Sequence, residues 1–237
     1  MDRAKPYRLG IIFVHGIQGR PEQLAFLTEC LPDTVLVRSV LLPGHGLTVR
    51  EFRRSGSRQW RSALKADCLW MREQCDKTIF VGHSMGCLLG LLAEQENRIF
   101  AGMLLVCCPF HFRLTLRYVR YSCLAACTKR NSPYVEAVRK ANGVYARHAV
   151  SYLTCFRPYM ELFKLMRKTR TQPLHCPDAT LFCFAEKDEI VSKKSILYVK
   201  NALHTEARLL PDCGHNYFTE SAKAYLTKAL SDILSRI

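Results

Sequence analysis

Residues 82–86 have the sequence Gly-His-Ser-Met-Gly, which is the part of the chain best suited to nucleophilic catalysis. The segment fits the pattern G-x-S-x-G, in which a sharp strand-to-helix turn exposes a serine hydroxyl. Residues 77–81 before it are apolar and β-rich, as is typical of a buried parallel strand. Residues 87–94 after it have a helical pattern. We therefore predict that Ser84 is a nucleophile.

A serine hydroxyl needs a base that takes its proton, and the base needs a carboxylate that orients its ring. With this type of turn the serine comes first in the chain, the acid second and the histidine last. Asp188 follows an expected strand at 179–185, and Glu186 in the same loop is the competing carboxylate. His215 follows the last expected strand. We predict Ser84, Asp188 and His215 as the catalytic residues.

Acyl transfer also requires hydrogen-bond donors for the charge that develops on the substrate oxygen, and losing one donor costs about 3 kcal/mol. The backbone N–H of Met85, directly after the serine, is the first predicted donor. The second comes from the loop after the first strand, where Ile17 follows His15 and Gly16. The side chain of Ile17 would then form an apolar wall of the acyl site. This chemistry needs no metal or organic cofactor.

The remaining histidines that adjoin these motifs have structural explanations. His83 is adjacent to Ser84, and we expect it to pack beneath the serine. His15 and His45 lie in loops flanked by glycine, where structural hydrogen bonds are the ordinary role. We expect none of these three to replace His215 as the base.

The chain contains 12 cysteines. Most lie on expected apolar faces, namely Cys30, Cys68, Cys87, Cys107, Cys108, Cys123, Cys127 and Cys183. Their spacing matches no zinc motif, and the N-terminal apolar run resembles a core strand rather than a secretion signal. We therefore expect reduced thiols in a cytoplasmic protein. Cys213 is close to His215 in sequence but lacks further ligands, so we expect no metal site.

The ordered set of motifs resembles the α/β-hydrolase superfamily, and within it the serine hydrolases related to monoacylglycerol lipases and small bacterial carboxylesterases. The segments that carry the resemblance are, in chain order, residues 15–19, residues 42–46, Trp60 with Asp67, residues 82–86, Asp188 with Val191, and Gly214 with His215. Together they span nearly the whole chain. The family's sheet usually begins with two antiparallel strands, which the expected elements lack.

The resemblance implies an α/β-hydrolase fold, with a mostly parallel sheet of about six strands and a helical cap inserted after the fourth strand. The expected strands are 9–14, 34–41, 77–82, 102–107, 179–185 and 205–210, and a helix is expected over 191–203. Alternating strands and helices favour right-handed crossovers, and ligands then bind at the carboxyl ends of the strands.

The stretch from 109 to 176 separates two expected strands by far more than an ordinary connection. Its pattern predicts helices over 112–129, 134–152 and 157–170. We therefore assign residues 1–108 and 177–237 to the hydrolase core, and residues 109–176 to a helical cap.

The expected cap is strongly basic, with thirteen lysines and arginines but only two glutamates, in a chain whose formal net charge is +15. Apolar residues alternate with these charges. Such helices can lie on an anionic lipid surface or steer an anionic substrate. The alternative is a solvated outer face over an inner face packed on the core. No motif supports nucleic-acid binding.

These observations predict a carboxylic-ester hydrolase that forms an acyl-enzyme, with medium-chain or monoacylglycerol-type esters as substrates. A thioesterase or an amidase with the same three residues is the alternative, because fold and site do not determine the leaving group. A non-catalytic binding protein with a hydrolase fold is the alternative from another class. Such a protein usually lacks one of the three catalytic residues, whereas this chain has all three.

Overall fold

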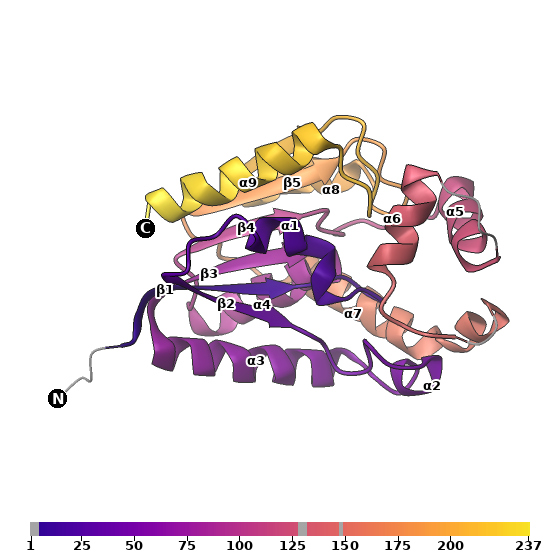
Figure 1. Cartoon of the computed structure of the whole chain (residues 1–237), viewed down its shortest axis with the longest axis horizontal. Coiled ribbons are helices and arrows are strands. Elements are labelled where there is room, and N and C mark those ends of the chain that lie inside the picture. Colours follow the sequence, from indigo (N-terminus) through magenta and orange to yellow (C-terminus); the bar gives the residue numbers. More distant parts are fainter. Residues whose placement is uncertain (1–4, 128–131, 147–148) are drawn as a thin grey trace.

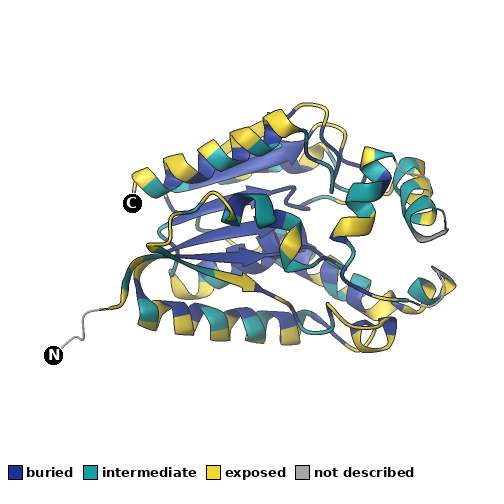
Figure 2. Cartoon of the chain, in the orientation of Figure 1, coloured by how far each residue is buried: buried dark blue, intermediate teal, exposed yellow. Residues whose placement is uncertain are grey.

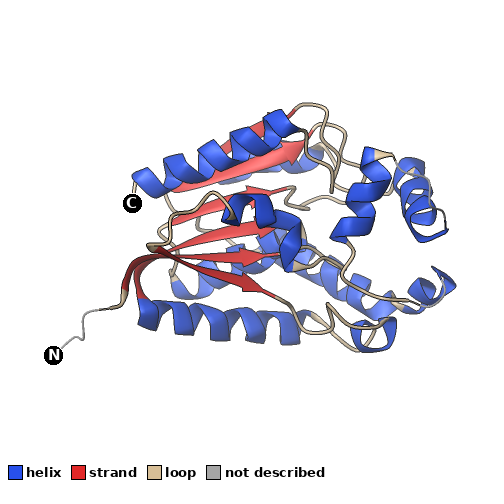
Figure 3. Cartoon of the chain, viewed as in Figure 1, coloured by secondary structure: helices blue, strands red, loops and turns tan. Residues whose placement is uncertain are grey.

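A parallel β-sheet forms the centre of the molecule, as shown by the computed structural model, which describes residues 5–127, 132–146 and 149–237 (Figures 1 and 3). The strands are β1 (Tyr7–Val14), β2 (Val35–Val40), β3 (Cys75–His83), β4 (Gly102–Val106), β5 (Ala179–Ala185) and β6 (Glu206–Leu210). Within the described residues the sheet has six strands in the order β2-β1-β3-β4-β5-β6, and every neighbouring pair is parallel. The predicted strands are confirmed, with ends that differ by up to two residues.

Helices cover both faces of this sheet (Figure 1). The α-helices are α1 (Ala25–Thr28), α2 (Val49–Phe52), α3 (Ser57–Gln74), α4 (Met85–Asn97), α5 (Leu116–Cys127), α6 (Pro133–Ala141), α7 (Phe156–Thr171), α8 (Lys194–Tyr198) and α9 (Glu220–Ser235). Three shorter segments are the 3₁₀ helices η1 (Pro21–Leu24) and η2 (Ala149–Thr154) and the π-helix η3 (Val199–Leu203). Helices α3, α4 and α7 pack together on one side, and α1 and α9 on the other.

The core lies between the sheet and these helices (Figure 2). Every residue of β4 is buried, and α4 is buried along almost its whole length because it packs beneath the central strands. The long apolar runs at residues 79–81 and 103–106 follow from this double coverage, since a strand buried on both faces has no polar side. A rigid centre of this kind can hold the loops at its carboxyl edge in fixed positions.

The segment at 109–176 differs in part from its predicted helices. Helix α5 begins at Leu116 rather than at 112, and the predicted end at 129 lies outside the described residues. The prediction of one helix over 134–152 was wrong, because α6 ends at Ala141 and Gly143 follows in a non-helical connection. Tyr145 then pairs with Thr48 in an isolated parallel bridge. The third prediction is confirmed by α7.

Two smaller expectations also need correction. The helix predicted over 191–203 begins only at Lys194 and continues as the π-helix η3. Cys30 and Cys123 are exposed, whereas Cys68, Cys87, Cys107, Cys108 and Cys183 are buried as expected, and Cys127 has no described side chain. Of the helices in the described ranges, none has both the length and the apolar character of a membrane span.

Candidate active site

Ser84 lies at the tight turn between β3 and α4, in a backbone conformation that side chains rarely adopt. Its φ is 51° and its ψ is −119°, and its N–H donates to the carbonyl oxygen of Val106 at 2.9 Å. Gly86 allows this geometry, because a Cβ at that position would lie 2.2 Å from the carbonyl oxygen of Val14. Strain of this kind persists only where the surrounding structure holds it. The turn therefore places the Ser84 hydroxyl at the carboxyl edge of the sheet.

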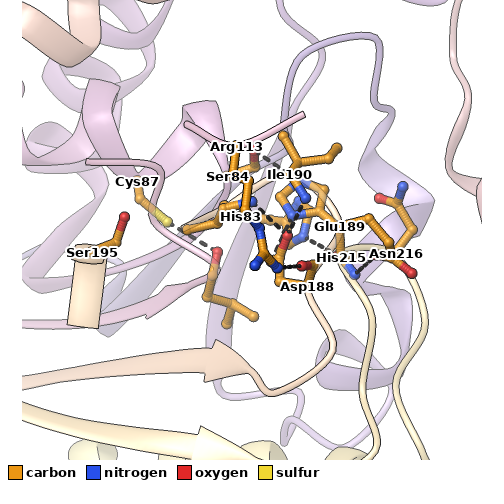
Figure 4. Close-up of polar contacts among 12 residues, drawn as sticks. His83, Ser84, Cys87, Arg113, Asp188, Glu189, Ile190, Ser195, His215 and Asn216 are labelled. Carbon is orange, nitrogen blue, oxygen red and sulfur yellow. Dashed lines mark hydrogen bonds and ion pairs between the residues drawn. The ribbon is translucent and has the colours of Figure 1, made fainter. Parts of the chain in front are cut away.

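The structure brings together the three residues that the sequence singles out (Figure 4). His215 Nε2 lies 3.0 Å from Ser84 Oγ, and His215 Nδ1 lies 2.9 Å from Asp188 Oδ2. The second oxygen, Asp188 Oδ1, accepts the backbone N–H groups of Ile190 and Val191 at 2.8 and 2.7 Å. Because Asp188 is held on both oxygens, it orients the imidazole so that Nδ1–H donates to the acid and Nε2 faces the serine.

The charges at this site reinforce one another despite deep burial. Burial by itself lowers the pKa of the His215 imidazole, but Asp188, with help from Glu189, outweighs burial and raises that pKa above its ordinary value. Burial likewise acts to raise the pKa of the Asp188 carboxyl, but His215 and the two backbone donors hold that pKa below its ordinary value. An imidazolium that forms during proton transfer from Ser84 would therefore be stabilised.

The loop after β1 lies against Ser84. A Cβ on Gly16 would lie 2.9 Å from Ser84 Cβ, so only a glycine permits this approach. Ile17 follows directly, and its half-buried side chain packs against the main core and a second apolar cluster. Met85 is the first residue of α4, where backbone N–H groups have no partner within the helix. The predicted donors, Ile17 and Met85, thus lie on the two segments that flank Ser84.

Three other buried histidines surround the site and are held neutral. His83 Nε2 donates to the backbone carbonyl of His215 at 2.9 Å, and burial lowers the pKa of His83 to about 3. His15 Nδ1 donates to the carbonyl of Gly16 while His15 Nε2 accepts the N–H of Leu42 at 3.1 Å, and burial lowers the pKa of His15 to about 4. The structural roles expected for both residues are confirmed.

His45 has a similar structural role. Its Nδ1 lies 3.2 Å from the carbonyl oxygen of Leu42, and its ring contacts the rings of Phe52 and Trp60. Burial, followed by repulsion from His15, lowers the pKa of His45 to about 3. His45 therefore supports the loop at 42–46 rather than exchanging protons with a substrate at neutral pH.

Two residues near the acid were not recognised in the sequence. Glu189 is buried, and its Oε2 accepts the backbone N–H of His215 at 2.8 Å. Arg113 Nη2 donates to the carbonyl oxygen of Asp188 at 3.0 Å. Glu186, the competing carboxylate, is instead exposed and accepts the N–H of Asp212 at 3.1 Å. Three of the four residues at 186–189 are acidic, which indicates a functional carboxylate in this loop. The residue types alone do not indicate whether Glu186 or Glu189 is buried.

A cluster of side chains that includes His215 has the residue types of a metal site. Donor atoms of His83, Cys107 and His215 lie within 4.8 Å of one another, and all three residues are buried. Both ring nitrogens of His215 are already engaged by Ser84 and Asp188, and burial raises the pKa of the Cys107 thiol well above its ordinary value. A metal ion here would have to displace the Ser84–His215–Asp188 arrangement. Cys213, for which the sequence predicts no metal binding, is buried beside Thr219.

The side chains of Ser84 and His215 are almost fully buried. Ser84 is 4% exposed and His215 is 5% exposed. A cavity of about 370 Å³ lies at the other end of the sheet, lined by Lys77, Ala101, Asp178, Ala179, Arg236 and Ile237. That cavity adjoins the amino ends of the strands, whereas Ser84 follows the carboxyl end of β3.

Comparison with known proteins agrees with this fold. The chain matches the alpha/beta hydrolase family over residues 11–228 and therefore belongs to that family. It is also similar to the thermostable monoacylglycerol lipase of Bacillus sp. (strain H-257), at 25% identity over 104 residues. This match covers 40% of the chain and 38% of the lipase.

Solved structures share the fold over nearly the whole chain. A structure from work on the metagenome-derived lipolytic enzymes LipS and LipT has a TM-score of 0.69 and 20% identity, and the match covers 98% of this chain and 96% of that one. A soluble variant of monoglyceride lipase from Saccharomyces cerevisiae has a TM-score of 0.71 and 13% identity, with 100% and 89% of the two chains covered. At these identities the likeness establishes the α/β-hydrolase fold.

Proposed function

We propose that the protein is a serine hydrolase that cleaves carboxylic esters through an acyl-enzyme. The observation that carries this proposal is the continuous hydrogen-bonded chain from Ser84 Oγ through His215 to Asp188, at 3.0 and 2.9 Å. A nucleophile, a base and an orienting carboxylate at these separations are the parts that acyl transfer from a serine requires. Ser84 at a strained turn supports the same role.

In the proposed reaction, Ser84 Oγ attacks the ester carbonyl while His215 Nε2 takes the hydroxyl proton. The N–H groups of Ile17 and Met85 bind the oxyanion. His215 then gives the proton to the leaving alcohol, which leaves the acyl group bonded to Ser84. Water attacks this acyl-enzyme by the same route, releases the acid and returns the proton to the serine. Asp188 stabilises the imidazolium in both steps.

We infer that residues 109–176 form a cap and that the acyl chain lies beneath it. The support is an apolar cluster that joins the loop after β1 to this segment, built from Val49, Phe52, Val144 and Cys155 with Ile17, Ala146, Tyr152 and Tyr159 around it. This cluster contacts Ile17, the residue after Gly16, which lies against Ser84, so its apolar side chains suit a medium-chain acyl group. Similarity to a monoacylglycerol lipase favours monoacylglycerol-type esters as the substrate class.

A thioester is the second candidate substrate, because acyl carriers are anionic and the cap is basic. A panel of p-nitrophenyl esters, monoacylglycerols, acyl thioesters and aminoacyl amides separates these classes by kcat/KM. We expect the highest values for oxygen esters. Higher values for the thioesters would replace the proposed substrate class while leaving the catalytic residues unchanged.

We also propose that the cap contacts an anionic lipid surface. Leu116, Leu153 and Phe156 are 90%, 80% and 71% exposed, and exposed Arg120 and Arg157 lie on the same two helices as Leu116 and Phe156. Apolar side chains beside cations suit the boundary of a membrane that carries negative lipids. The free thiols of the described cysteines suit a cytoplasmic location, which we propose for the protein.

The Lys168 and Arg170 side chains, by contrast, are engaged within the molecule. Lys168 Nζ pairs with Glu96, and Arg170 Nη1 donates to the carbonyl oxygen of Phe110. Lys129, Arg130 and Arg147 of the basic segment lie outside the described residues. The proposed lipid contact therefore rests on the residues around Arg120 and Arg157.

Labelling with a fluorophosphonate probe tests the proposed reaction. Ser84→Ala should lose the label and lower ester turnover by about 10⁴-fold or more, with its circular dichroism spectrum unchanged. Ser221→Ala removes an exposed serine from α9 and should keep both activities. Full turnover by Ser84→Ala would rule out the assignment. Absence of labelling in the folded wild-type protein would favour a non-catalytic binding function.

A further inference from the structure

Glu189 is a second buried carboxylate at the candidate site, beside the proposed acid. The residue is 5% exposed, and its Oε2 accepts the backbone N–H of His215 at 2.8 Å (Figure 4). A buried carboxylate is costly unless hydrogen bonds or an opposite charge compensate for its lost hydration. Glu189 has both, because its Oε1 lies 3.8 Å from Nε of Arg117.

The chain is shaped to admit this carboxylate. A Cβ on Gly214 would lie 2.8 Å from Glu189 Oε1 and 3.0 Å from Oε2. Only a glycine at 214 therefore lets the carboxylate reach the N–H of the next residue, His215. Gly214 therefore leaves space for the Glu189 carboxylate, and His215 supplies the N–H that this carboxylate accepts.

Helices α5 and α6 contact Glu189 and the loop that carries His215. Arg117 of α5 lies over the rings of Tyr121 and Tyr134, at 5.3 and 4.8 Å from their centroids. Tyr134 of α6 also donates through its hydroxyl to the carbonyl oxygen of Asp212 at 2.9 Å. The proposed cap is therefore connected to both loops that carry the base and the acid.

We propose that Glu189 is a positioning residue that holds His215 in line with Ser84, and that Arg117 makes this contact depend on α5 lying over the site. The inference rests on the proposed function. Through its charge Glu189 favours the protonated imidazole, and through its hydrogen bond it holds the loop. In the absence of the Arg117 charge from α5, Glu189 would lack its cation and the His215 loop would be less firmly held.

The charged and titratable groups that face His215 determine whether removal of the Glu189 charge raises or lowers the pKa of His215. Asp188 and Glu189 are the carboxylates that raise the pKa of His215. His83 on β3 is neutral near pH 7, because burial lowers its pKa to about 3, and burial keeps the Cys107 thiol after β4 neutral. Arg117 acts through Glu189 from α5. Removal of the Glu189 charge should therefore make the imidazolium less stable.

Two conservative variants separate the charge from the hydrogen bond. Glu189→Gln keeps the size and an acceptor oxygen but removes the charge, so the pKa of His215 should fall. Glu189→Asp keeps the charge but shortens the reach to the backbone N–H, so kcat should fall by about tenfold with little change in KM. Glu186→Gln is the matched control, because this exposed carboxylate in the same loop also accepts one backbone N–H.

The measurement is a nitrogen-15 NMR titration of the His215 ring in the wild-type protein and the variants, together with the pH profile of kcat/KM. The acidic limb should move to lower pH in Glu189→Gln and stay in place in Glu186→Gln. Equal His215 titrations in wild type and Glu189→Gln, or unchanged kcat in Glu189→Asp, would overturn the inference. The NMR titration requires no turnover, and fluorophosphonate labelling of wild type tests the proposed function separately.

Discussion

The backbone N–H of Gly143 donates to the carbonyl oxygen of Gln18 at 2.6 Å, which joins the middle of the proposed cap to the loop after β1. Gln18 has a φ of 54° and directly follows Ile17, the proposed second oxyanion donor. The carbonyl oxygen of Gly143 in turn accepts the N–H of Gly46 at 2.6 Å. The loop that carries the proposed donor Ile17 is therefore held by a hydrogen bond from the proposed cap as well as by the sheet.

Gly143→Ala should disrupt this link. The added Cβ would lie 2.3 Å from the carbonyl oxygen of Gly19, and this backbone atom can move only if the whole loop shifts. We expect kcat to fall by about tenfold or more, because small misplacements of catalytic groups are costly. Overpacking should also lower the free energy of unfolding by about 1–3 kcal/mol. Ester kinetics and urea unfolding measure the two effects.

Gly56→Ala is the control for that substitution. Its Cβ would meet the flexible side chain of Glu161, at 3.1 Å from Cγ, which can move aside. Activity close to wild type is expected. If Gly143→Ala kept wild-type kcat, the proposed role of the loop after β1 would be wrong.

The activity should rise with pH through the titration of His215. Asp188 and Glu189 raise the pKa of His215 despite burial, and the base must be neutral to take the proton of Ser84. kcat/KM should therefore fall about tenfold per pH unit on the acidic side of that pKa, which lies above the ordinary histidine value. Hydrolysis of a soluble ester between pH 5 and 8 checks this. A flat profile, with chemistry shown to limit the rate, would contradict His215 as the base.

The buried neutral histidines should make the fold sensitive to acid. In the folded state the pKa is about 4 for His15 and about 3 for His45 and His83, below the unfolded value of 6.5. The unfolded chain therefore binds more protons below pH 6.5, and each histidine lowers the free energy of unfolding by up to about 1.4 kcal/mol per pH unit. This loss continues until the pH reaches the folded pKa. Urea unfolding at pH 7, 6 and 5 measures the slope.

Substitution of one of these histidines tests the sign. His45→Gln should reduce the slope of the unfolding free energy against pH by the contribution of one proton, about 1.4 kcal/mol per pH unit, even if it lowers stability at pH 7. His204→Asn replaces an exposed histidine at a φ of 51°, a conformation that asparagine tolerates, and should leave the slope unchanged. Equal slopes in both variants would show that burial of His45 does not control acid stability.

Medium-chain esters should be better substrates than acetyl esters. The apolar cluster around Val144 and Tyr159 adjoins Ile17, and each buried CH₂ contributes about 0.8 kcal/mol. kcat/KM should thus rise by up to about fourfold per methylene until the pocket ends. A p-nitrophenyl series from acetyl through butyryl to octanoyl measures this. A clear preference for acetyl would refute the proposed acyl site.

Vesicle binding should depend on the exposed apolar residues of the cap. Replacing Leu153 and Phe156 with serine should weaken binding to vesicles of anionic lipid while leaving hydrolysis of a small soluble ester unchanged. Binding of the wild type should also weaken with salt, since screening shortens the Debye length from about 10 Å at 0.1 M to about 3 Å at 1 M. Cosedimentation with vesicles is the measurement.

The matched control replaces Leu69 and Trp70 of α3, which are 49% and 40% exposed, with serine. These residues also present exposed apolar surface, but on a helix of the core, so their loss should leave vesicle binding intact. Equal binding by wild type and the cap variant would show that the exposed cap residues form an ordinary solvated surface.

The strands and the candidate catalytic residues could be predicted from the sequence, because local chemistry determines them. A buried parallel strand requires an apolar run, and the strained turn at Ser84 requires small neighbours such as Gly86. Asp188 and His215 follow strands of one parallel sheet, whose carboxyl ends meet at the same edge. This topology therefore pairs Ser84 with His215, although they lie 131 positions apart in the sequence.

Only the tertiary structure decided the conformation of the cap and which neighbouring acid lies inside. Residues 142–146 have a helical pattern, yet Gly143 and Tyr145 bond to loops of the core instead of continuing α6. Glu186 and Glu189 occupy one loop, and only Glu189 is buried, because Gly214 leaves space for its carboxylate and Arg117 supplies a charge from α5. These outcomes depend on contacts between distant segments, which residue type and spacing alone do not encode.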